Sequence, residues 1–249
     1  ISLLSLSPSI QYFEKVSIGN RMGITFSSIK EEGIFEIRYI ESSKSKTHLV
    51  NNRGYRIVSS LPENLNYLDW AGQVKNKGKI LINEVLPVSQ GDKNPRITMK
   101  MVLPVWQVSV DESHPLATNK FSGVLMFVID ATSLIEKITK SITSGKTGYA
   151  RVIDEKGTFL FHPEREFIGK NAFEARKEKK STISFDRINE IQKEMMLAGK
   201  EGASWYISGW HRGREEEMKK LIAYTPIWIS EPENRIWSVA VAAPISEVE

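Results

Sequence analysis

Apolar residues recur along the chain with two different periods, and this difference separates the predicted helices from the predicted strands. In the first 30 residues they recur at gaps of three and four, as at Met22, Phe26 and Ile29, which predicts a long N-terminal helix. From Ile34 to Ile40, β-branched and aromatic residues nearly alternate with polar ones, which is typical of a strand. After a polar turn at 42–46, we expect the chain to return as a second strand at 47–50.

The rest of the first half combines a helical connection with three further strands. Pro62 opens a helical stretch that continues to about residue 74, with Leu65, Leu68 and Ala71 on one face. The pattern then predicts strands at 80–86, 99–106 and 121–129, and a helix at 131–144.

The second half repeats this order of elements. We expect strands at 149–154 and 158–161 around a hairpin turn, a helix at 186–197, and strands at 204–208, 219–226 and 236–243. The charged run at 176–180 is predicted to be a solvated loop. The sequence therefore predicts an α+β fold with two domains in tandem, each an antiparallel sheet with flanking helices. We expect an N-terminal helix at 1–32, a first domain at 33–144 that ends with its connecting helix, and a second domain at 145–249.

Composition narrows the possible classes of protein. The chain has 249 residues, of which 41% are hydrophobic and 26% charged, as in an ordinary globular protein. It contains no cysteine, which excludes disulfides, thiolate metal sites and cysteine nucleophiles. A net charge of +4 from mixed positive and negative residues is weak for a nucleic-acid binder, so we expect no nucleic-acid partner. The longest apolar runs, at 124–129 and 239–243, are far shorter than the about 20 residues of a transmembrane helix.

No motif in the sequence indicates catalysis or a bound metal. The histidines are His48, His114, His162 and His211, and none lies four residues from another. The signatures GxxxxGK[ST], GxGxxG and GxSxG do not occur, and no pair of acidic residues is singled out for acid–base chemistry. We therefore expect no catalytic residue, no metal and no cofactor in this chain.

The most specific feature of the sequence is a tight hairpin from which the chain departs abruptly. Gly157 permits a positive φ in the turn, and Pro163 ends the ladder and favours extended backbone at His162. The segment 147–171 strongly resembles the membrane-proximal module of double Cache domains, the PAS-like extracellular sensors of bacterial and archaeal histidine kinases and chemoreceptors. The residues that match the family pattern are Gly148, Tyr149, Val152, Asp154, Gly157, His162, Pro163, Gly169 and Asn171.

The resemblance extends more loosely over nearly the whole chain, and it implies a function. It implies the extracellular or periplasmic part of a plasma-membrane receptor, in which a small molecule binds the distal domain and changes the conformation of the membrane helices. A sensor histidine kinase of a two-component system is the leading expectation for the full-length protein, with a chemotaxis receptor as the other output. The resemblance also implies a homodimer through the N-terminal helix and membrane spans outside this chain. The alternative is a structural or dimerisation module that binds no ligand.

One branch of the family binds amino acids through an RxWY element and a strand aspartate, and this chain departs from that pattern. The corresponding positions hold Leu65, Tyr67, Leu68 and Val128, so the groups that would pair with an amino acid's carboxylate and ammonium are missing. We therefore do not expect amino-acid recognition through that motif.

A PAS-like pocket between the sheet and its helical face would be lined by side chains with an apolar body and a polar tip. Core packing is the alternative role for the aromatic candidates, and strand alternation favours a solvent-facing lysine at position 100. We expect His162 to make a structural hydrogen bond rather than to sense pH. The candidate ligand-binding residues are Tyr39, Tyr55, Tyr67, Trp70, Lys100 and Met101.

Overall fold

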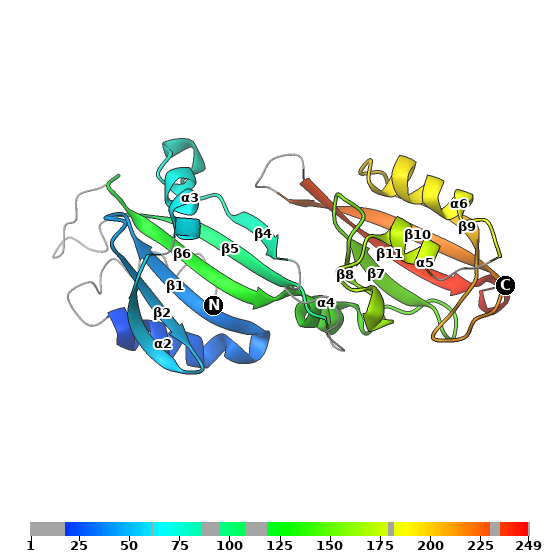
Figure 1. Cartoon of the computed structure of the whole chain (residues 1–249), viewed down its shortest axis with the longest axis horizontal. Coiled ribbons are helices and arrows are strands. Elements are labelled where there is room, and N and C mark those ends of the chain that lie inside the picture. The colour runs from blue at the N-terminus through cyan, green and yellow to red at the C-terminus, as the bar shows by residue number, and fades with distance from the viewer. Residues whose placement is uncertain are drawn as a thin grey trace. The chain divides into compact units, whose positions relative to one another are not determined.

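The structure is a computed structural model that describes residues 18–60, 62–85, 95–107, 119–178, 182–229 and 235–248. The chain folds into two compact units (Figure 1): unit 1 comprises Ile1–Val85 and Met99–Asp130, and unit 2 comprises Leu86–Thr98 and Ala131–Glu249. Residues 1–17, which hold the first part of the predicted N-terminal helix, lie outside the described residues. Among the helices within these ranges, none has both the length and the apolar character needed to cross a membrane.

Unit 1 is a six-stranded sheet with helices packed on it. The strand order is β3-β2-β1-β6-β5-β4, and β1 pairs antiparallel with both β2 and β6. The strands are β1 (Ile34–Glu41), β2 (Lys46–Asn51), β3 (Gly54–Ser59), β4 (Leu81–Val85), β5 (Thr98–Trp106) and β6 (Phe121–Asp130). The helices are α2 (Ile18–Ile29) and α3 (Pro62–Ala71), with short 3-10 turns η3 (Lys30–Glu32) and η4 (Val74–Asn76).

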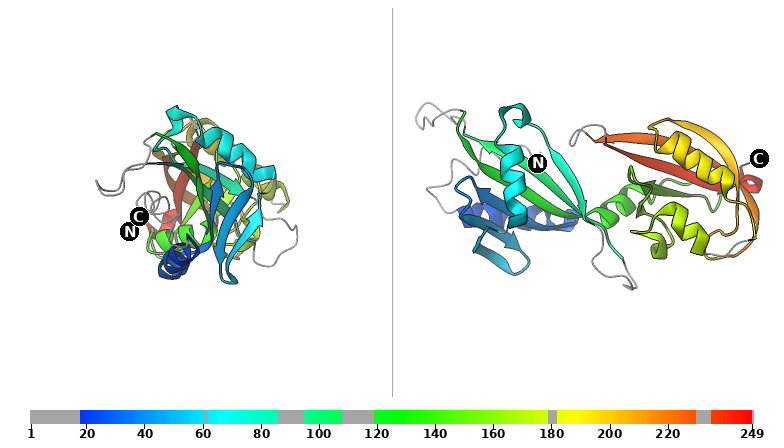
Figure 2. Two further views of the ribbon diagram at one scale, coloured as in Figure 1. Left: turned by 90° about the vertical axis from the view of Figure 1, so that its left-hand side faces the viewer. Right: turned by 45° about the horizontal axis from the view of Figure 1, so that its top comes forward.

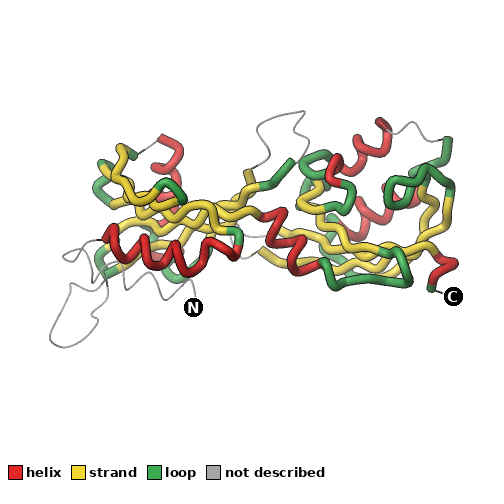
Figure 3. The backbone as a smooth tube through the Cα atoms, turned by 90° about the horizontal axis from the view of Figure 1, so that it is seen from below, coloured by secondary structure: helices red, strands yellow, loops and turns green. Residues whose placement is uncertain are grey.

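The alternation of side chains along the strands explains why the two faces of this sheet carry different helices. Ile40 on β1 and Met126 on β6 are fully buried in an apolar cluster with Leu68 of α3. The opposite face is crossed by α2 (Figure 3), which packs on β1, β2 and β3 and buries Met22 and Phe26. The α3 face and the α2 face of unit 1 are therefore separate surfaces.

Unit 2 is a five-stranded antiparallel sheet in the order β8-β7-β11-β10-β9. Its helix α6 continues as a π-helical turn, η6, and lies along the sheet (Figure 2, right). The strands are β7 (Tyr149–Ile153), β8 (Phe159–Phe161), β9 (Gly202–Ser208), β10 (Met218–Ile229) and β11 (Arg235–Pro244). The helical elements are α4 (Ala131–Thr139), η5 (Arg165–Phe167), α5 (Ala172–Glu178), α6 (Asp186–Glu190), η6 (Ile191–Met196) and η7 (Ile245–Glu247).

The turn between β7 and β8 has the geometry that the sequence predicted. Gly157 has a φ of +80°, which confirms the need for glycine there. The Asp154 carboxylate accepts hydrogen bonds from the backbone N–H groups of Lys156 (2.9 Å) and Thr158 (2.7 Å). The Asn171 side chain donates to the Lys156 carbonyl oxygen at 2.9 Å. These contacts fix the hairpin and the direction in which the chain leaves it.

The α+β class with two tandem sheets is confirmed, and two elements without a clear apolar stripe were not predicted. β3 was not predicted, because almost all of its residues are exposed and its sequence lacks an apolar face. The solvated loop expected at 176–180 is wrong for residues 176–178, which belong to α5, and residues 179–180 lie outside the described residues. Arg176 is moreover only 5% exposed. This face of α5 packs in the core through Ala172 and Ala175. Alanine side chains are too small to give a clear periodic signal in the sequence.

The connecting helix is shorter than predicted, and its grouping differs from the expected one. α4 ends at Thr139 rather than at 144. It groups with unit 2, whereas the sequence placed the helix with the first domain; the boundaries at 33–144 and 145–249 stay a prediction.

Candidate functional site

The sheet of unit 1 divides the six predicted ligand-binding residues between its two faces. Tyr67 and Trp70 lie on α3. Lys100 Nζ is 5.8 Å from the centre of the Tyr67 ring, so Lys100 lies on the α3 face of β5 rather than turning away from it. Met101 is the next residue along β5 and therefore points to the opposite face. The α3 face thus brings three of the six residues together.

Tyr39 and Tyr55 lie on the α2 face and take part in structural contacts. Tyr39 is 1% exposed, and its hydroxyl donates to the Ser122 carbonyl oxygen at 3.0 Å. The Tyr55 hydroxyl is 2.7 Å from His48 Nδ1, and His48 Nε2 is 2.8 Å from Glu41 Oε1. Burial, followed by the nearby charge of Glu41, raises the pKa of Tyr55. The chain from Tyr55 through His48 to Glu41 links β3, β2 and β1, and the Tyr39 hydroxyl joins β1 to β6. Both tyrosines therefore help to hold the sheet together.

The α3 face combines an aromatic surface with polar groups. The Tyr67 hydroxyl accepts a hydrogen bond from Asn83 Nδ2 on β4 at 3.2 Å. Trp70 is partly buried against the apolar cluster of this face. Asn64 lies one turn before Tyr67 on α3, is 2% exposed, and has a buried Oδ1 with no hydrogen-bond partner among the described residues. An aromatic ring, a cation and an unsatisfied acceptor on one face are suited to a small polar molecule.

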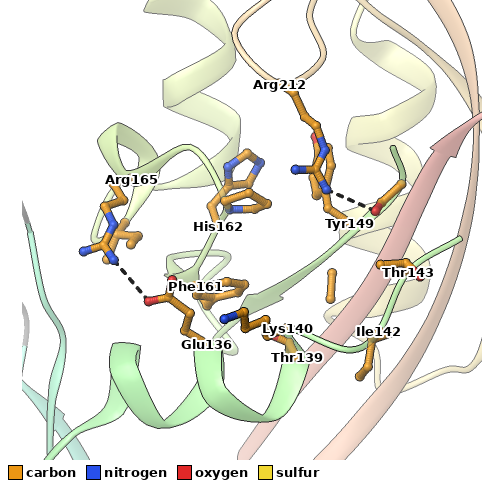
Figure 4. Close-up of a pocket in the computed structure, with 14 residues that line it drawn as sticks. Glu136, Thr139, Lys140, Ile142, Thr143, Tyr149, Phe161, His162, Arg165 and Arg212 are labelled. Atoms are coloured by element: carbon orange, nitrogen blue, oxygen red, sulfur yellow. Dashed lines mark hydrogen bonds and ion pairs between the residues drawn. The ribbon is translucent and has the colours of Figure 1, made fainter. Parts of the chain in front are cut away.

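Unit 2 contains a cavity of about 230 Å³ beside β7 and β8 (Figure 4). On one side, Arg165 donates to Glu136 of α4 at 3.1 Å. On the other side, the guanidinium of Arg212 lies 5.9 Å from the centre of the Tyr149 ring and donates to the Thr147 carbonyl oxygen at 2.7 Å. Ligand pockets in proteins usually begin at about 300 Å³, so this cavity suits a very small molecule.

His162 lines the same cavity, and its contacts confirm the structural role that the sequence predicted. Its Nδ1 accepts a hydrogen bond from the Glu164 backbone N–H at 3.0 Å, and its ring is enclosed by Tyr149, Phe159 and Phe167. Burial, followed by repulsion from the charge of Arg151, holds the pKa of His162 well below its usual range. The ring is therefore neutral near pH 7 and accepts a proton only in acid.

Sequence reasoning did not foresee the cavity of unit 2. Its polar rim comes from residues far apart in the chain, such as Glu136, Arg165 and Arg212, none of which belongs to a recognisable motif. Among the residues that line the cavity, Gly148, Tyr149, His162 and Pro163 belong to the hairpin pattern found in the sequence. Within the described ranges, no three histidine, aspartate or glutamate side chains come together as a group that could hold a metal.

Solved structures with this fold are sensor domains of membrane receptors. The periplasmic sensory domain of the Campylobacter jejuni chemoreceptor Tlp1 aligns with a TM-score of 0.58 and 16% identity, over 98% of this chain and 87% of that one. The extracellular domain of the putative histidine kinase vpHK1S-Z8 aligns with a TM-score of 0.56 and 14% identity, over 99% and 81%. The ligand-binding domain of the Pseudomonas fluorescens chemoreceptor CtaA, solved with L-serine, aligns with a TM-score of 0.53 and 11% identity, over 96% and 84%.

The fold thus places the protein among sensor domains built from two tandem PAS-like units. Residues 6–249 match the Cache domain family, and the chain belongs to that family. No curated protein matches the chain. The resemblance recognised in the hairpin is therefore confirmed, and the chain shares its fold with sensor domains of histidine kinases and chemoreceptors.

Proposed function

We propose that this chain is the extracellular or periplasmic sensing part of a membrane-anchored histidine kinase, and that unit 1 binds a small molecule on its α3 face. The observation that carries the site is the buried Oδ1 of Asn64 beside Tyr67, which accepts no hydrogen bond from any residue that the structure describes. A buried acceptor without a donor costs about 1–3 kcal/mol, which a ligand that donates a hydrogen bond would recover. Lys100 adds a cation on the same face.

Signalling follows if the ligand binds two arrangements of the chain with different affinity. A ligand shifts a conformational equilibrium only by its differential binding free energy. Contacts that join α3 to β4 and β5, such as the one between Tyr67 and Asn83, are placed to change on binding because they connect separate elements of unit 1. The membrane segments at either end of the chain would receive the change.

The site can be tested by a screen of metabolites in a thermal unfolding assay. A ligand at 100 times its dissociation constant stabilises the protein by about 2.7 kcal/mol. Tyr67→Ala and Trp70→Ala should abolish the response to a hit while unit 2 stays folded. Tyr55→Ala is the matched control, since it removes a tyrosine from the opposite face of the same sheet.

Three results decide between this site and its alternatives. Loss of the response in Tyr67→Ala with retention in Tyr55→Ala supports the α3 face. The reverse result would place the ligand on the α2 face. A screen in which no metabolite class shifts the unfolding temperature would favour the structural or dimerisation module instead.

The same proposal includes a homodimer through the N-terminal helix. Ile24 on α2 is 66% exposed, and no atom lies within 4 Å of a Cβ placed at its neighbour Gly23, so the outer side of α2 can accept a close partner. Ile24→Glu should shift the protein from dimer to monomer in sedimentation velocity. An unchanged dimer in this variant would show that α2 is not the contact.

A further inference from the structure

The interior of unit 2 holds an unusual concentration of positive charge. Arg151 on β7, Arg176 on α5 and Lys220 on β10 are only 4%, 5% and 0% exposed. Charged side chains are almost never this deeply buried unless they are paired. Arg151 and Arg176 line one small internal cavity, together with Tyr149, Tyr206 and Trp210.

Arg151 is the cation whose hydrogen-bonding capacity is least used. Its Nε and Nη2 are both buried and have no hydrogen-bond partner among the described residues. The N–H bonds of these two nitrogens point in parallel from one edge of the guanidinium, which is the edge that receives both oxygens of a carboxylate. The guanidinium lies 5.8 Å from the centre of the Tyr206 ring, which covers it without supplying a counter-charge.

The other two cations are held by neutral groups. Arg176 donates to Asn189 Oδ1 at 2.5 Å and to Gln192 Oε1, and Lys220 donates to the Trp210 carbonyl oxygen at 2.7 Å. These contacts give each cation at least one oxygen acceptor but leave its charge in place.

The carboxylate of Glu164 acts on this group but does not occupy the fork of Arg151. Its charge favours the protonated form of Lys220, whereas Arg151 opposes it. Because the Nε–H and Nη2–H groups of Arg151 donate to no oxygen of Glu164 or of any other described residue, this edge of the guanidinium stays available. Burial of like charges is costly, and burial followed by repulsion from Arg151 lowers the pKa of Arg176 to about 9 and that of Lys220 to about 7. A bound anion would relieve both effects.

We propose that the interior of unit 2 is a second binding site, which takes a short aliphatic monocarboxylate on the Nε–Nη2 edge of Arg151. The carboxylate would pair with Arg151, and the hydrocarbon part would lie against the ring of Trp210 and the side chains of Phe185 and Ile188 that line the same cavity. The cavity volume of about 10 Å³ corresponds to about one water molecule, so even acetate, with its four heavy atoms, binds only if the walls of the cavity move apart.

The cavity shares a wall residue with a larger one. Tyr149 lines both this cavity and the one beside β7 and β8. The site is distinct from the α3 face of unit 1 and goes beyond the ligand proposed there.

The test uses the whole chain with sodium acetate and sodium propionate as probes, by calorimetric titration and thermal unfolding. Propionamide, which has nearly the same shape without the charge, and sodium chloride at equal ionic strength are the controls. We expect acetate or propionate to bind and to raise the unfolding temperature, and neither control to do so. Absence of binding by both carboxylates, or an equal response to propionamide or chloride, would overturn the proposal.

Variants then assign the binding to Arg151. Arg151→Lys keeps the positive charge but loses the paired N–H edge, and should weaken carboxylate binding about 10- to 100-fold. Arg187→Lys is the matched control, because Arg187 is an exposed arginine of unit 2 that donates to the Trp205 carbonyl oxygen at 2.7 Å. This variant should bind carboxylates as tightly as the unaltered chain does. Equal affinity in Arg151→Lys and the unaltered chain would refute the assignment. Loss of the response in Tyr67→Ala would place the carboxylate in unit 1 and refute it as well.

Discussion

Replacing Lys220 by methionine removes a charge from the core of unit 2 while nearly keeping the length of the side chain. Lys220 is fully buried; its ammonium donates to the Trp210 carbonyl oxygen at 2.7 Å and lies 5.5 Å from the centre of the Tyr149 ring. Burial, and then repulsion from Arg151, lowers the pKa of Lys220 from 10.5 to about 7, although the charge of Glu164 opposes this. The folded chain therefore holds this proton less tightly than the unfolded chain does.

The sign and size of the effect follow from this difference in pKa. Between pH 7 and pH 10.5 the unfolded state binds more protons than the folded state, so the free energy of unfolding rises with pH. The part of the unfolding free energy that depends on Lys220 is fully present above pH 10.5, where the lysine is neutral in both states, and is lost as the pH falls toward 7. At about 1.4 kcal/mol per pH unit, the whole difference is about 5 kcal/mol, of which about 2 kcal/mol falls between pH 7 and pH 9.

Lys220→Met should abolish this dependence. Below pH 7 the variant should be more stable than the unaltered chain by several kcal/mol, reduced by about 1 kcal/mol for the lost hydrogen bond to Trp210. The advantage should shrink steadily as the pH rises to 9.

Urea unfolding between pH 6 and pH 10, followed by tryptophan fluorescence, measures this difference. The signal reports mainly on unit 2, because that unit holds four of the six tryptophans, namely Trp205, Trp210, Trp228 and Trp237. Lys219→Met is the matched control, since Lys219 is the neighbouring lysine on the same strand and is exposed. If the two variants show the same pH dependence, or if Lys220→Met is the less stable protein at pH 6, the interior charge is not the cause that the structure indicates.

Two further variants test the hairpin and its histidine. Gly157→Val should destabilise unit 2 by more than about 1 kcal/mol, because valine disfavours the φ of +80° and its Cβ would lie 3.0 Å from the Phe173 ring; unchanged urea unfolding would contradict this. His162→Asn keeps an acceptor for the Glu164 N–H but removes a group that can take up a proton. Because the buried imidazole must be protonated as the pH falls below 6.5, the variant should lose less stability in acid than the unaltered chain. An equal loss of stability in acid would refute the burial argument.

Periodicity predicted the strands well because most of them bury at least one face. The predicted strands at 34–40 and 121–129 and the observed β1 and β6 nearly coincide, since β-branched and aromatic residues dominate both. β3 gave no such signal, because an edge strand that is exposed along almost its whole length has no need of an apolar face. The Gly157 turn was predictable because a positive φ leaves few alternatives to glycine.

The candidate site was harder to predict, because a sequence shows which residues alternate but not which face a distant helix covers. Lys100 and Met101 are adjacent on one strand, so alternation alone already assigns them to opposite faces. The loops between α3 and β5 decide whether α3 covers the face of Lys100 or that of Met101, and these loops carry no periodic pattern. Arg151 is hidden for a related reason: both faces of β7 are buried, so its neighbours Ala150 and Val152 do not distinguish an interior arginine from an exposed one.

The two units show what the fold requires and what it does not. Among the described residues of unit 1, no arginine or lysine is buried, yet the unit forms a sheet of six strands with packed helices. Unit 2 has the same kind of architecture, and its described part buries three cations, one of which lacks a described partner on the two nitrogens of one guanidinium edge. Since a buried, unpaired charge destabilises a protein and the fold forms without one, the cations of unit 2 call for a reason other than folding. An anion that binds there would supply that reason, and it would convert a destabilised interior into one whose stability depends on the ligand.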